Sequence, residues 1–321
     1  MTQKFRTLLC TAALACVPLL GSAQAWPSKT VKVVLPGAPG SSADQIARML
    51  AERLSKKWGQ AVVIENKPGV ATRLGAEFVA RSAPDGYTLL STFASHSKMK
   101  LTYPDAPDPL KDFTPIARHG EAEVAFIVRD DSPYKSLKEL TAGVKASNKP
   151  LRYAHFGNGS SYHVFGLMMG REAGFDVLPV AYKGETQQMT DLIGGHIESS
   201  FNSVGNALPQ VQAGKVRALA VVAPARSKVL PDVPTFAELG VPGMTSGGWF
   251  GFLAPAGTPQ ALVDKIAADI NAILQDPVVA KAMRDQGVEP IGSSPRDFAQ
   301  LIEQDVRQWT RLFAEFNLKV E

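Results

Sequence analysis

The chain has 321 residues, with 34 Lys and Arg against 30 Asp and Glu, so its formal net charge is +4. So small an excess of positive charge argues against a nucleic-acid partner, which usually requires a dense basic surface. A chain of this length with 45% apolar residues can bury a large core, more often as two domains than as one.

The N-terminal segment predicts export. Lys4 and Arg6 precede an apolar run from about residue 8 to residue 20, and Ala23-Gln24-Ala25 follows as a cleavage motif. The run is too short to cross a membrane as a helix, which takes about 20 residues. We therefore expect a signal peptide over residues 1–25, cleaved after Ala25, and a mature protein in the periplasm.

Both cysteines, Cys10 and Cys16, lie inside this segment. The mature chain would then have no disulfide, no thiolate nucleophile and no cysteine metal site. An alternative to simple cleavage is lipidation at Cys16, because Leu14-Ala15-Cys16 resembles an incomplete lipobox.

Strand-like and helix-like stretches alternate in the first part of the mature chain. Apolar patterns predict strands over 31–35, 61–64 and 87–90, with helices over about 46–58 and 74–83 between them. Gly59 follows the first helix and is a typical C-terminal capping residue. This βαβαβ order implies a mostly parallel sheet covered by helices.

A second α/β set begins near residue 124. Its expected strands and helices are 124–128, 136–147, 151–154, 160–173, 177–180, 185–193, 197–201, 203–213 and 216–222. Beyond Gly248 the pattern reads as helical, with Thr258 capping a helix that has Pro259 at its first position and Ser294 opening a last helix. We expect domain 1 to comprise residues 26–122 and 249–321, and domain 2 residues 123–248.

Two Gly- and Ser-rich loops each link a predicted strand to a predicted helix. They read Pro36-Gly37-Ala38-Pro39-Gly40-Ser41-Ser42-Ala43-Asp44 and Gly157-Asn158-Gly159-Ser160-Ser161. The start of a helix exposes N–H groups that have no helical partner, next to the positive end of the helix dipole, so each loop predicts a site for a small anion such as a carboxylate. Because more than a hundred residues separate the loops, we expect two domains to hold one ligand.

Segments spread over the whole mature chain carry a family likeness. Besides the two loops they include Trp26-Pro27-Ser28, Gly59-Gln60-Ala61-Val62-Val63-Ile64-Glu65-Asn66, Ala83-Pro84-Asp85-Gly86-Tyr87, Tyr182-Lys183-Gly184, Leu230-Pro231-Asp232-Val233-Pro234 and Leu253-Ala254-Pro255-Ala256-Gly257-Thr258-Pro259. The chain resembles the Bug-type receptors of tripartite tricarboxylate transporters, which are extracytoplasmic solute-binding proteins. The resemblance implies an α/β chain with a type II periplasmic-binding-protein fold and a small organic carboxylate in the cleft between two domains. It also implies a two-subunit membrane permease as partner.

The resemblance and the loops together define an expected ligand site. We assign to it Ala38, Pro39, Gly40, Ser41, Ser42, Asp44, Arg73, Phe93, Ser95, His96, His155, Gly157, Asn158, Gly159, Ser160, Ser161, Tyr182, Lys183, Gly184 and Asn202. Arg73 and Asn202 replace a neutral and an acidic residue of the family pattern, which favours a dianion over a cationic amino acid. The alternative for Arg73 is an ion pair with Glu77, one helical turn further on.

The residues leave the exact ligand and two other function classes open. Phe93, Phe156 and Tyr162 beside the loops favour an aromatic dicarboxylate such as terephthalate, with an aliphatic dicarboxylate as the alternative. A soluble sensor that presents its ligand to a membrane signalling partner would have the same sequence. An enzyme is the third class, but the chain has no phosphate-binding P-loop and no G-x-S-x-G nucleophile elbow.

We expect no cofactor and no metal. A metal site formed by His96, His155 and His163 is the alternative, although the sequence lacks an H-E-x-x-H motif. The second loop also lacks the full G-x-G-x-x-G motif of dinucleotide-binding proteins, because Tyr162 stands at the position of the third glycine. We also expect the receptor to be a monomer with no nucleic-acid partner.

Overall fold

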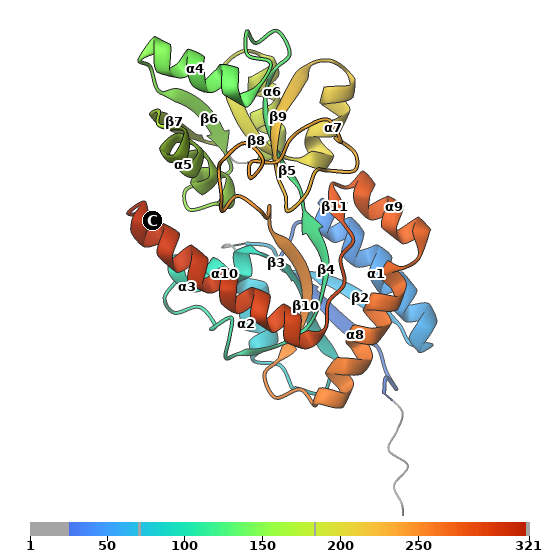
Figure 1. Cartoon of the computed structure of the whole chain (residues 1–321). Helices are drawn as coiled ribbons and strands as arrows, with labels where there is room; N and C mark the ends of the chain where they lie inside the picture. Colours follow the sequence, from blue (N-terminus) through green and yellow to red (C-terminus); the bar gives the residue numbers. More distant parts are fainter. Residues whose placement is uncertain (1–25, 70–71, 183, 319–321) are drawn as a thin grey trace, which may run out of the picture.

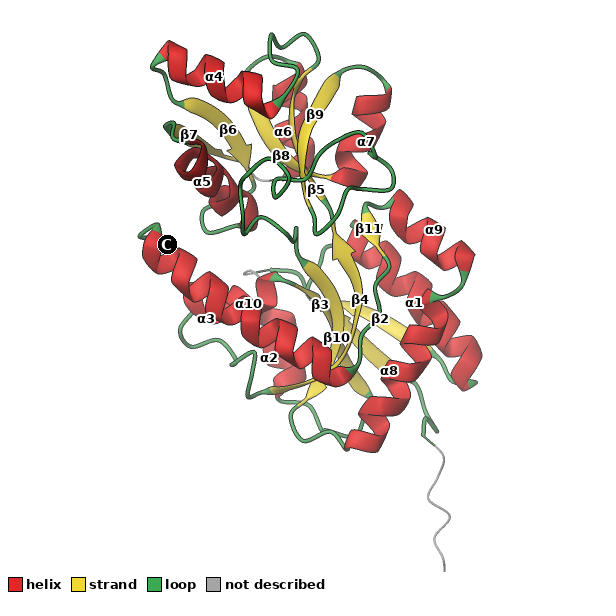
Figure 2. Cartoon of the chain, in the orientation of Figure 1, coloured by secondary structure: helices red, strands yellow, loops and turns green. Residues whose placement is uncertain are grey.

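The structure is a computed structural model that describes residues 26–69, 72–182 and 184–318. Within these residues the strands form two sheets, and helices cover both faces of each (Figures 1 and 2). We call the part built on the first sheet lobe 1 and the part built on the second sheet lobe 2. The expectation of a mixed α/β chain is confirmed, whereas the signal peptide expected over residues 1–25 lies outside the described residues.

Lobe 1 is built on a six-stranded sheet of order β11-β4-β10-β3-β1-β2. Its strands are β1 (Val31–Leu35), β2 (Val62–Asn66), β3 (Thr88–Phe93), β4 (Phe113–Ala122), β10 (Trp249–Pro255) and β11 (Val288–Glu289). Its helices are α1 (Ser42–Trp58), α2 (Arg73–Ala80), α3 (Ser95–Thr102), α8 (Gln260–Leu274), α9 (Pro277–Asp285) and α10 (Pro295–Glu315). Strands β2, β1 and β3 are parallel, as the βαβαβ pattern predicts.

Lobe 2 is built on a five-stranded sheet of order β7-β6-β8-β5-β9. Its strands are β5 (Val124–Arg129), β6 (Leu151–His155), β7 (Val177–Ala181), β8 (Ser199–Ser203) and β9 (Val216–Val222). Its helices are α4 (Leu137–Ser147), α5 (Ser161–Ala173), α6 (Glu185–Ile193) and α7 (Val204–Gln212). Strands β7, β6 and β8 are parallel, and β5 is antiparallel to both of its neighbours.

The stretch after Gly248 differs from the prediction. It begins with β10, which lies antiparallel between β3 and β4 near the middle of the sheet. Trp249, Phe252 and Leu253 of this strand are all buried, so the run lacks the alternation that marks a half-exposed strand. Thr258 does not cap α8, because its hydroxyl donates to the Pro255 carbonyl and the N-cap residue is Pro259.

Two predicted helix ends are confirmed. Gly59 ends α1 in the left-handed conformation, with φ of 67°, and its N–H donates to the Ser55 carbonyl. Ser294 opens α10, where its hydroxyl oxygen accepts the Asp297 N–H. Both signals depend on residues within one helical turn, which is why the sequence shows them.

Helix α10 joins the two lobes. Phe298 and Ile302, in its first half, pack in the core of lobe 1. Trp309, Leu312 and Phe313, in its second half, pack in the core of lobe 2. Figure 1 shows the helix running from the lower end of lobe 1 to the side of α5. The helix is therefore a shared wall as well as a connection.

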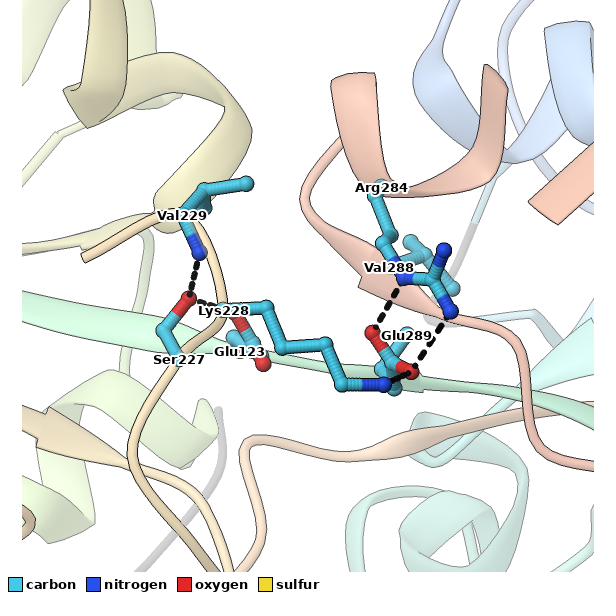
Figure 3. Close-up of a pocket in the computed structure, with 7 residues that line it drawn as sticks. All are labelled: Glu123, Ser227, Lys228, Val229, Arg284, Val288 and Glu289. Atoms are coloured by element: carbon cyan, nitrogen blue, oxygen red, sulfur yellow. Dashed lines mark hydrogen bonds and ion pairs between the residues drawn. The ribbon is translucent and has the colours of Figure 1, made fainter. Parts of the chain in front are cut away.

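Charged residues also link the lobes beside the crossover from β4 to β5 (Figure 3). Glu289 of lobe 1 accepts from the guanidinium of Arg284 at 2.9 and 3.1 Å and from Lys228 of lobe 2 at 2.6 Å. Glu123, in the crossover, accepts the hydroxyl of Ser227. Because the Lys228 side chain is 65% exposed, its ion pair contributes less than about 1 kcal/mol, and the link positions the lobes more than it stabilises them.

Phe298 provides a test of the lobe 1 core. Its side chain is fully buried and meets the Trp249 ring edge-on, with 5.0 Å between ring centroids. Phe298→Ala should lower the free energy of unfolding by about 3–5 kcal/mol, as measured by urea denaturation, because it removes apolar contacts and leaves a cavity. The control is Phe78→Ala at a side chain that is 39% exposed, which should cost about 1 kcal/mol or less. Equal losses in the two variants would contradict this description of the core.

Candidate functional site

A cleft with a cavity volume of about 1110 Å³ lies between the lobes. Lobe 1 contributes the loop before α1, both ends of α3 and the start of β10, and lobe 2 contributes the loop before α5 and the starts of α6 and α7. The polar residues that line it include Ser41, Ser42, Ser95, Lys98, Thr102, Asn158, Ser160, Ser161, Glu185 and Ser203. Its aromatic lining is Phe93, Tyr103, Phe156, Tyr162, Trp249 and Phe250.

The loop before α1 is held in place by the buried carboxylate of Asp44. This carboxylate accepts from the Gly40 N–H at 3.0 Å, from Arg48 Nε at 2.9 Å and from Asn66 Nδ2 at 2.8 Å. Asn66 also donates to the Gly37 carbonyl, which closes the loop onto the end of β2. Burial by itself raises the pKa of Asp44, but the donors from Arg48, Gly40 and Asn66 together lower it to about 2.

The loop before α5 is held by two stacked histidines. Ser160 caps the helix by accepting the His163 N–H at 3.2 Å, and the Gly159 N–H donates to His163 Nδ1 at 3.2 Å. The His155 ring stacks on His163 with centroids 4.5 Å apart, and its Nδ1 contacts the Gly157 carbonyl at 2.9 Å. Burial lowers the pKa of His163 to about 4, so the ring is neutral at pH 7 and acts as a support for the loop.

Both helix starts present unused N–H groups. In the described part of the chain, the N–H groups of Ser42 and Ala43 on α1 and of Ser161 and Tyr162 on α5 have no hydrogen-bond partner. All four residues line the cleft. Unpaired N–H groups at the positive end of a helix dipole attract anions, and here the two sets belong to different lobes. A carboxylate in the cleft therefore has donors available from both sides.

Two charged side chains line the same cleft. Lys98, on α3 of lobe 1, is only 6% exposed and donates to the Ser161 hydroxyl of lobe 2 at 2.7 Å. Glu185, at the start of α6, accepts from the Tyr162 hydroxyl at 2.6 Å and from the N–H and hydroxyl of Ser203 at 3.0 and 2.6 Å. The sequence did not single out either residue, because neither its burial nor its position facing the cleft follows from a local pattern.

The structure brings nine of the twenty predicted site residues to the cleft. Those that line it are Ala38, Ser41, Ser42, Phe93, Ser95, Asn158, Gly159, Ser160 and Ser161. Those that do not line it are Pro39, Gly40, Asp44, Arg73, His96, His155, Gly157, Tyr182, Gly184 and Asn202. Lys183 lies outside the described residues. Of the second group, Gly40, Asp44, His155 and Gly157 support the loops from behind, and Pro39 has no N–H to donate.

Arg73 takes the alternative that the sequence left open. Its Nε lies 2.5 Å from a Glu77 oxygen, and its two terminal nitrogens donate to both oxygens of Asp105 at 3.0 and 2.7 Å. Two carboxylates therefore occupy the guanidinium, which is not among the residues that line the cleft. The expectation that Arg73 lies in the ligand site and favours a dianion is not supported by this arrangement.

His96, Tyr182 and Asn202 also have local roles in the fold. His96 is fully buried, with its ring 4.7 Å from that of Phe113, and burial lowers its pKa to about 3. Tyr182 packs against a core cluster of lobe 2. Asn202 is fully buried, and its side-chain amide donates to the Ser200 hydroxyl at 2.7 Å. These side chains make contacts inside their own lobe and do not line the cleft.

The three histidines of the alternative metal site do not converge. Across residues 26–69, 72–182 and 184–318, no group of three or more His, Cys, Asp or Glu side chains is arranged to hold a metal ion. In the same residues no helix is both long and apolar enough to cross a membrane.

The two α/β lobes with a cleft between them define a type II periplasmic-binding-protein fold, the fold of extracytoplasmic solute-binding proteins. The sequence profile of the tripartite tricarboxylate transporter family receptor matches residues 46–318, and the chain belongs to this family. Its members are periplasmic solute-binding receptors that bind small carboxylates and work with a membrane transporter; they are not enzymes.

Three relatives illustrate the similarity. Protein BugT of Bordetella pertussis is 30% identical, over 100% of this chain and 99% of its own length. An R. palustris protein solved with adipate is 30% identical with a TM-score of 0.79, over 92% of this chain and 99% of its own. MatC of Rhodopseudomonas palustris, solved with bound malate, is 33% identical with a TM-score of 0.74, over 89% and 99%.

The charge of Asp44 should stabilise the fold above about pH 4. Because its pKa in the folded protein, about 2, lies below the ordinary 3.8, this stability is present above pH 3.8 and is lost as the pH falls through 2. The difference corresponds to about 2 kcal/mol. Urea unfolding at pH 6 should show Asp44→Asn less stable than wild type by roughly that amount, and the gap should close toward pH 2. Parallel stability curves would show that the ionised carboxylate does not hold the loop.

Proposed function

We propose that the protein captures a small organic carboxylate, best a dicarboxylate, in the cleft and delivers it to a two-subunit membrane permease. The observation that carries this proposal is the convergence of two helix starts, from different lobes, on one cleft with four unused N–H groups. One carboxylate is bound there by backbone donors. Because the donors belong to two lobes, ligand binding favours closure of the lobes onto each other.

The choice of a dicarboxylate is supported by the relatives solved with adipate and with malate, both of which are dicarboxylates. The aromatic lining of the cleft adds support for a flat acid such as terephthalate, since aromatic side chains bury large apolar areas against a ring. The second carboxylate must avoid Glu185, whose negative charge would repel it.

A thermal-shift screen with the mature protein tests this function. Terephthalate, adipate and malate are compared with benzoate and hexanoate as monocarboxylates and with citrate as a tricarboxylate. A dicarboxylate at 100 times its Kd should stabilise the protein by about 2.7 kcal/mol, which raises Tm by several degrees. No shift with any carboxylate at millimolar concentration would overturn the proposed function.

N-terminal sequencing of the exported protein tests the proposed cleavage after Ala25.

Proline substitutions test the role of the backbone donors. Ser42 and Ser161 stand at the first position of α1 and α5, where proline is well tolerated, and each follows an extended serine with ψ near 160°. Ser42→Pro and Ser161→Pro should fold normally but remove one N–H each. Since a hydrogen bond to a charged group is worth about 1.5–3 kcal/mol, each should weaken carboxylate binding about 10- to 150-fold by calorimetry.

Ser42→Ala is the matched control, because it keeps the N–H and removes only the hydroxyl, whereas the Ser161 hydroxyl also accepts from Lys98. Ser42→Ala should leave affinity nearly unchanged. If Ser42→Pro and Ser161→Pro both fold and bind the ligand as the wild type does, the helix starts are not the site.

A further inference from the structure

Lys98 is a buried cation at the edge of the cleft. Its side chain is 6% exposed, and it lies on α3 among the residues that line the cavity. Its Nζ donates to the Ser161 hydroxyl at 2.7 Å and stands 3.9 Å above the centre of the Trp309 ring. In the chain as described, no carboxylate forms an ion pair with it within 4.0 Å.

This environment leaves the positive charge only partly compensated. A neutral hydroxyl and an aromatic face stabilise an ammonium much less than a carboxylate does, and removing an ammonium from water is costly. Asp305 of α10 attracts Lys98 from beyond ion-pair distance. The Asp305 carboxylate is engaged instead by the Nε1–H groups of Trp249 and Trp309, at 3.0 and 2.8 Å.

The hydrogen bond of Lys98 places its charge at the predicted carboxylate site. Ser161, which accepts from Nζ, is the first residue of α5, and its own N–H is one of the four unused donors. An anion that accepts from the Ser161 N–H therefore lies close to the ammonium, which donates to the hydroxyl of the same residue. We propose that Lys98 is the counter-ion of the bound carboxylate, so that binding requires the charged lysine and, at alkaline pH, is accompanied by uptake of a proton by the Lys98 amine.

The inference rests on the proposed function, since it assumes that the cleft binds a carboxylate. Burial lowers the pKa of Lys98 to about 8, with Asp305 opposing the shift. A carboxylate bound beside it would raise this pKa again. The charged fraction of the free protein falls from about nine-tenths at pH 7 to about one-tenth at pH 9, so the apparent affinity should fall about tenfold over that range.

Other titratable groups lie on the elements around this side of the cleft. Asp305 on α10 acts on Lys98 directly, and the elements near it also carry Tyr162 and His163 on α5, Glu185 at the start of α6, and His96 and Tyr103 at the two ends of α3. Burial lowers the pKa of His96 to about 3 and of His163 to about 4, and it raises that of Tyr162 well above 10. Burial also raises the pKa of Asp305, against its hydrogen bonds. These shifts move the histidines and Tyr162 away from the range of pH 7 to 9.

Titration calorimetry of the wild type with adipate and with malate measures the effect. Both ligands are fully ionised from pH 7 to pH 9, so the ligand does not contribute protons. Affinity should fall about tenfold across this range, and at pH 9 two buffers of different ionisation enthalpy should report uptake of nearly one proton. Constant affinity and no proton uptake would overturn the proposal without the need for any variant.

Two variants assign the effect. Lys98→Met keeps an unbranched side chain, one heavy atom shorter, and removes the charge, so it should weaken binding at pH 7 at least tenfold and abolish the pH dependence. Lys100→Met, on the same helix but at an exposed lysine, should keep both the affinity and its pH profile. A pH dependence that persists in Lys98→Met would belong to another group and would overturn the role of Lys98.

The outcomes also separate this inference from the proposed function. If neither the thermal-shift screen nor calorimetry of the wild type detects any carboxylate, the proposed function fails and Lys98 has no ligand to pair with. If the wild type binds adipate or malate and Lys98→Met binds it equally well, the function stands and the counter-ion role fails.

Discussion

The site depends on one physical constraint: the first N–H groups of a helix have no partner in the helix. In this protein two such helix starts, those of α1 and α5, face one cleft from opposite lobes. The capping serine of each helix, Ser41 or Ser160, accepts the third N–H, and the first two N–H groups of each helix stay unpaired in the described chain. An anion that satisfies both sets must touch both lobes. Under the proposed function, the same interaction that binds the ligand favours the closed arrangement of the lobes.

The supports behind the two loops differ in chemistry but have the same result. Asp44 holds the first loop through a charged network with Arg48 and Asn66, whereas neutral, stacked His155 and His163 hold the second. In both cases the polar groups behind the loop are satisfied within the protein. They do not compete for the ligand, and they fix the backbone whose N–H groups face the cleft. Site residues that turn away from the cleft can thus be necessary to its shape.

The charge of the cleft is set by few residues. Arg73 is paired with Glu77 and Asp105 away from the cleft. Among the described residues that line the cleft, the charged side chains are Lys98 and Glu185. Lys98 lies beside the start of α5, and Glu185 contacts Tyr162 and Ser203. A carboxylate near Lys98 is favoured, and one near Glu185 is disfavoured. In the proposed function, this asymmetry and the backbone donors together orient the ligand in the cleft.

The sequence by itself determined the features that depend on neighbouring residues. The Gly- and Ser-rich loops, the cap at Ser294 and the end of α1 at Gly59 follow from hydrogen bonds within one helical turn, and the parallel β2-β1-β3 core follows from the βαβαβ order. Only the tertiary structure determined which charged side chains form ion pairs and which are buried. Asp105 reaches Arg73 from 32 positions away, and Lys98 is buried by Trp309 and Ser161 from other elements. Ion pairing and desolvation depend on which distant segments meet, and no local pattern records that.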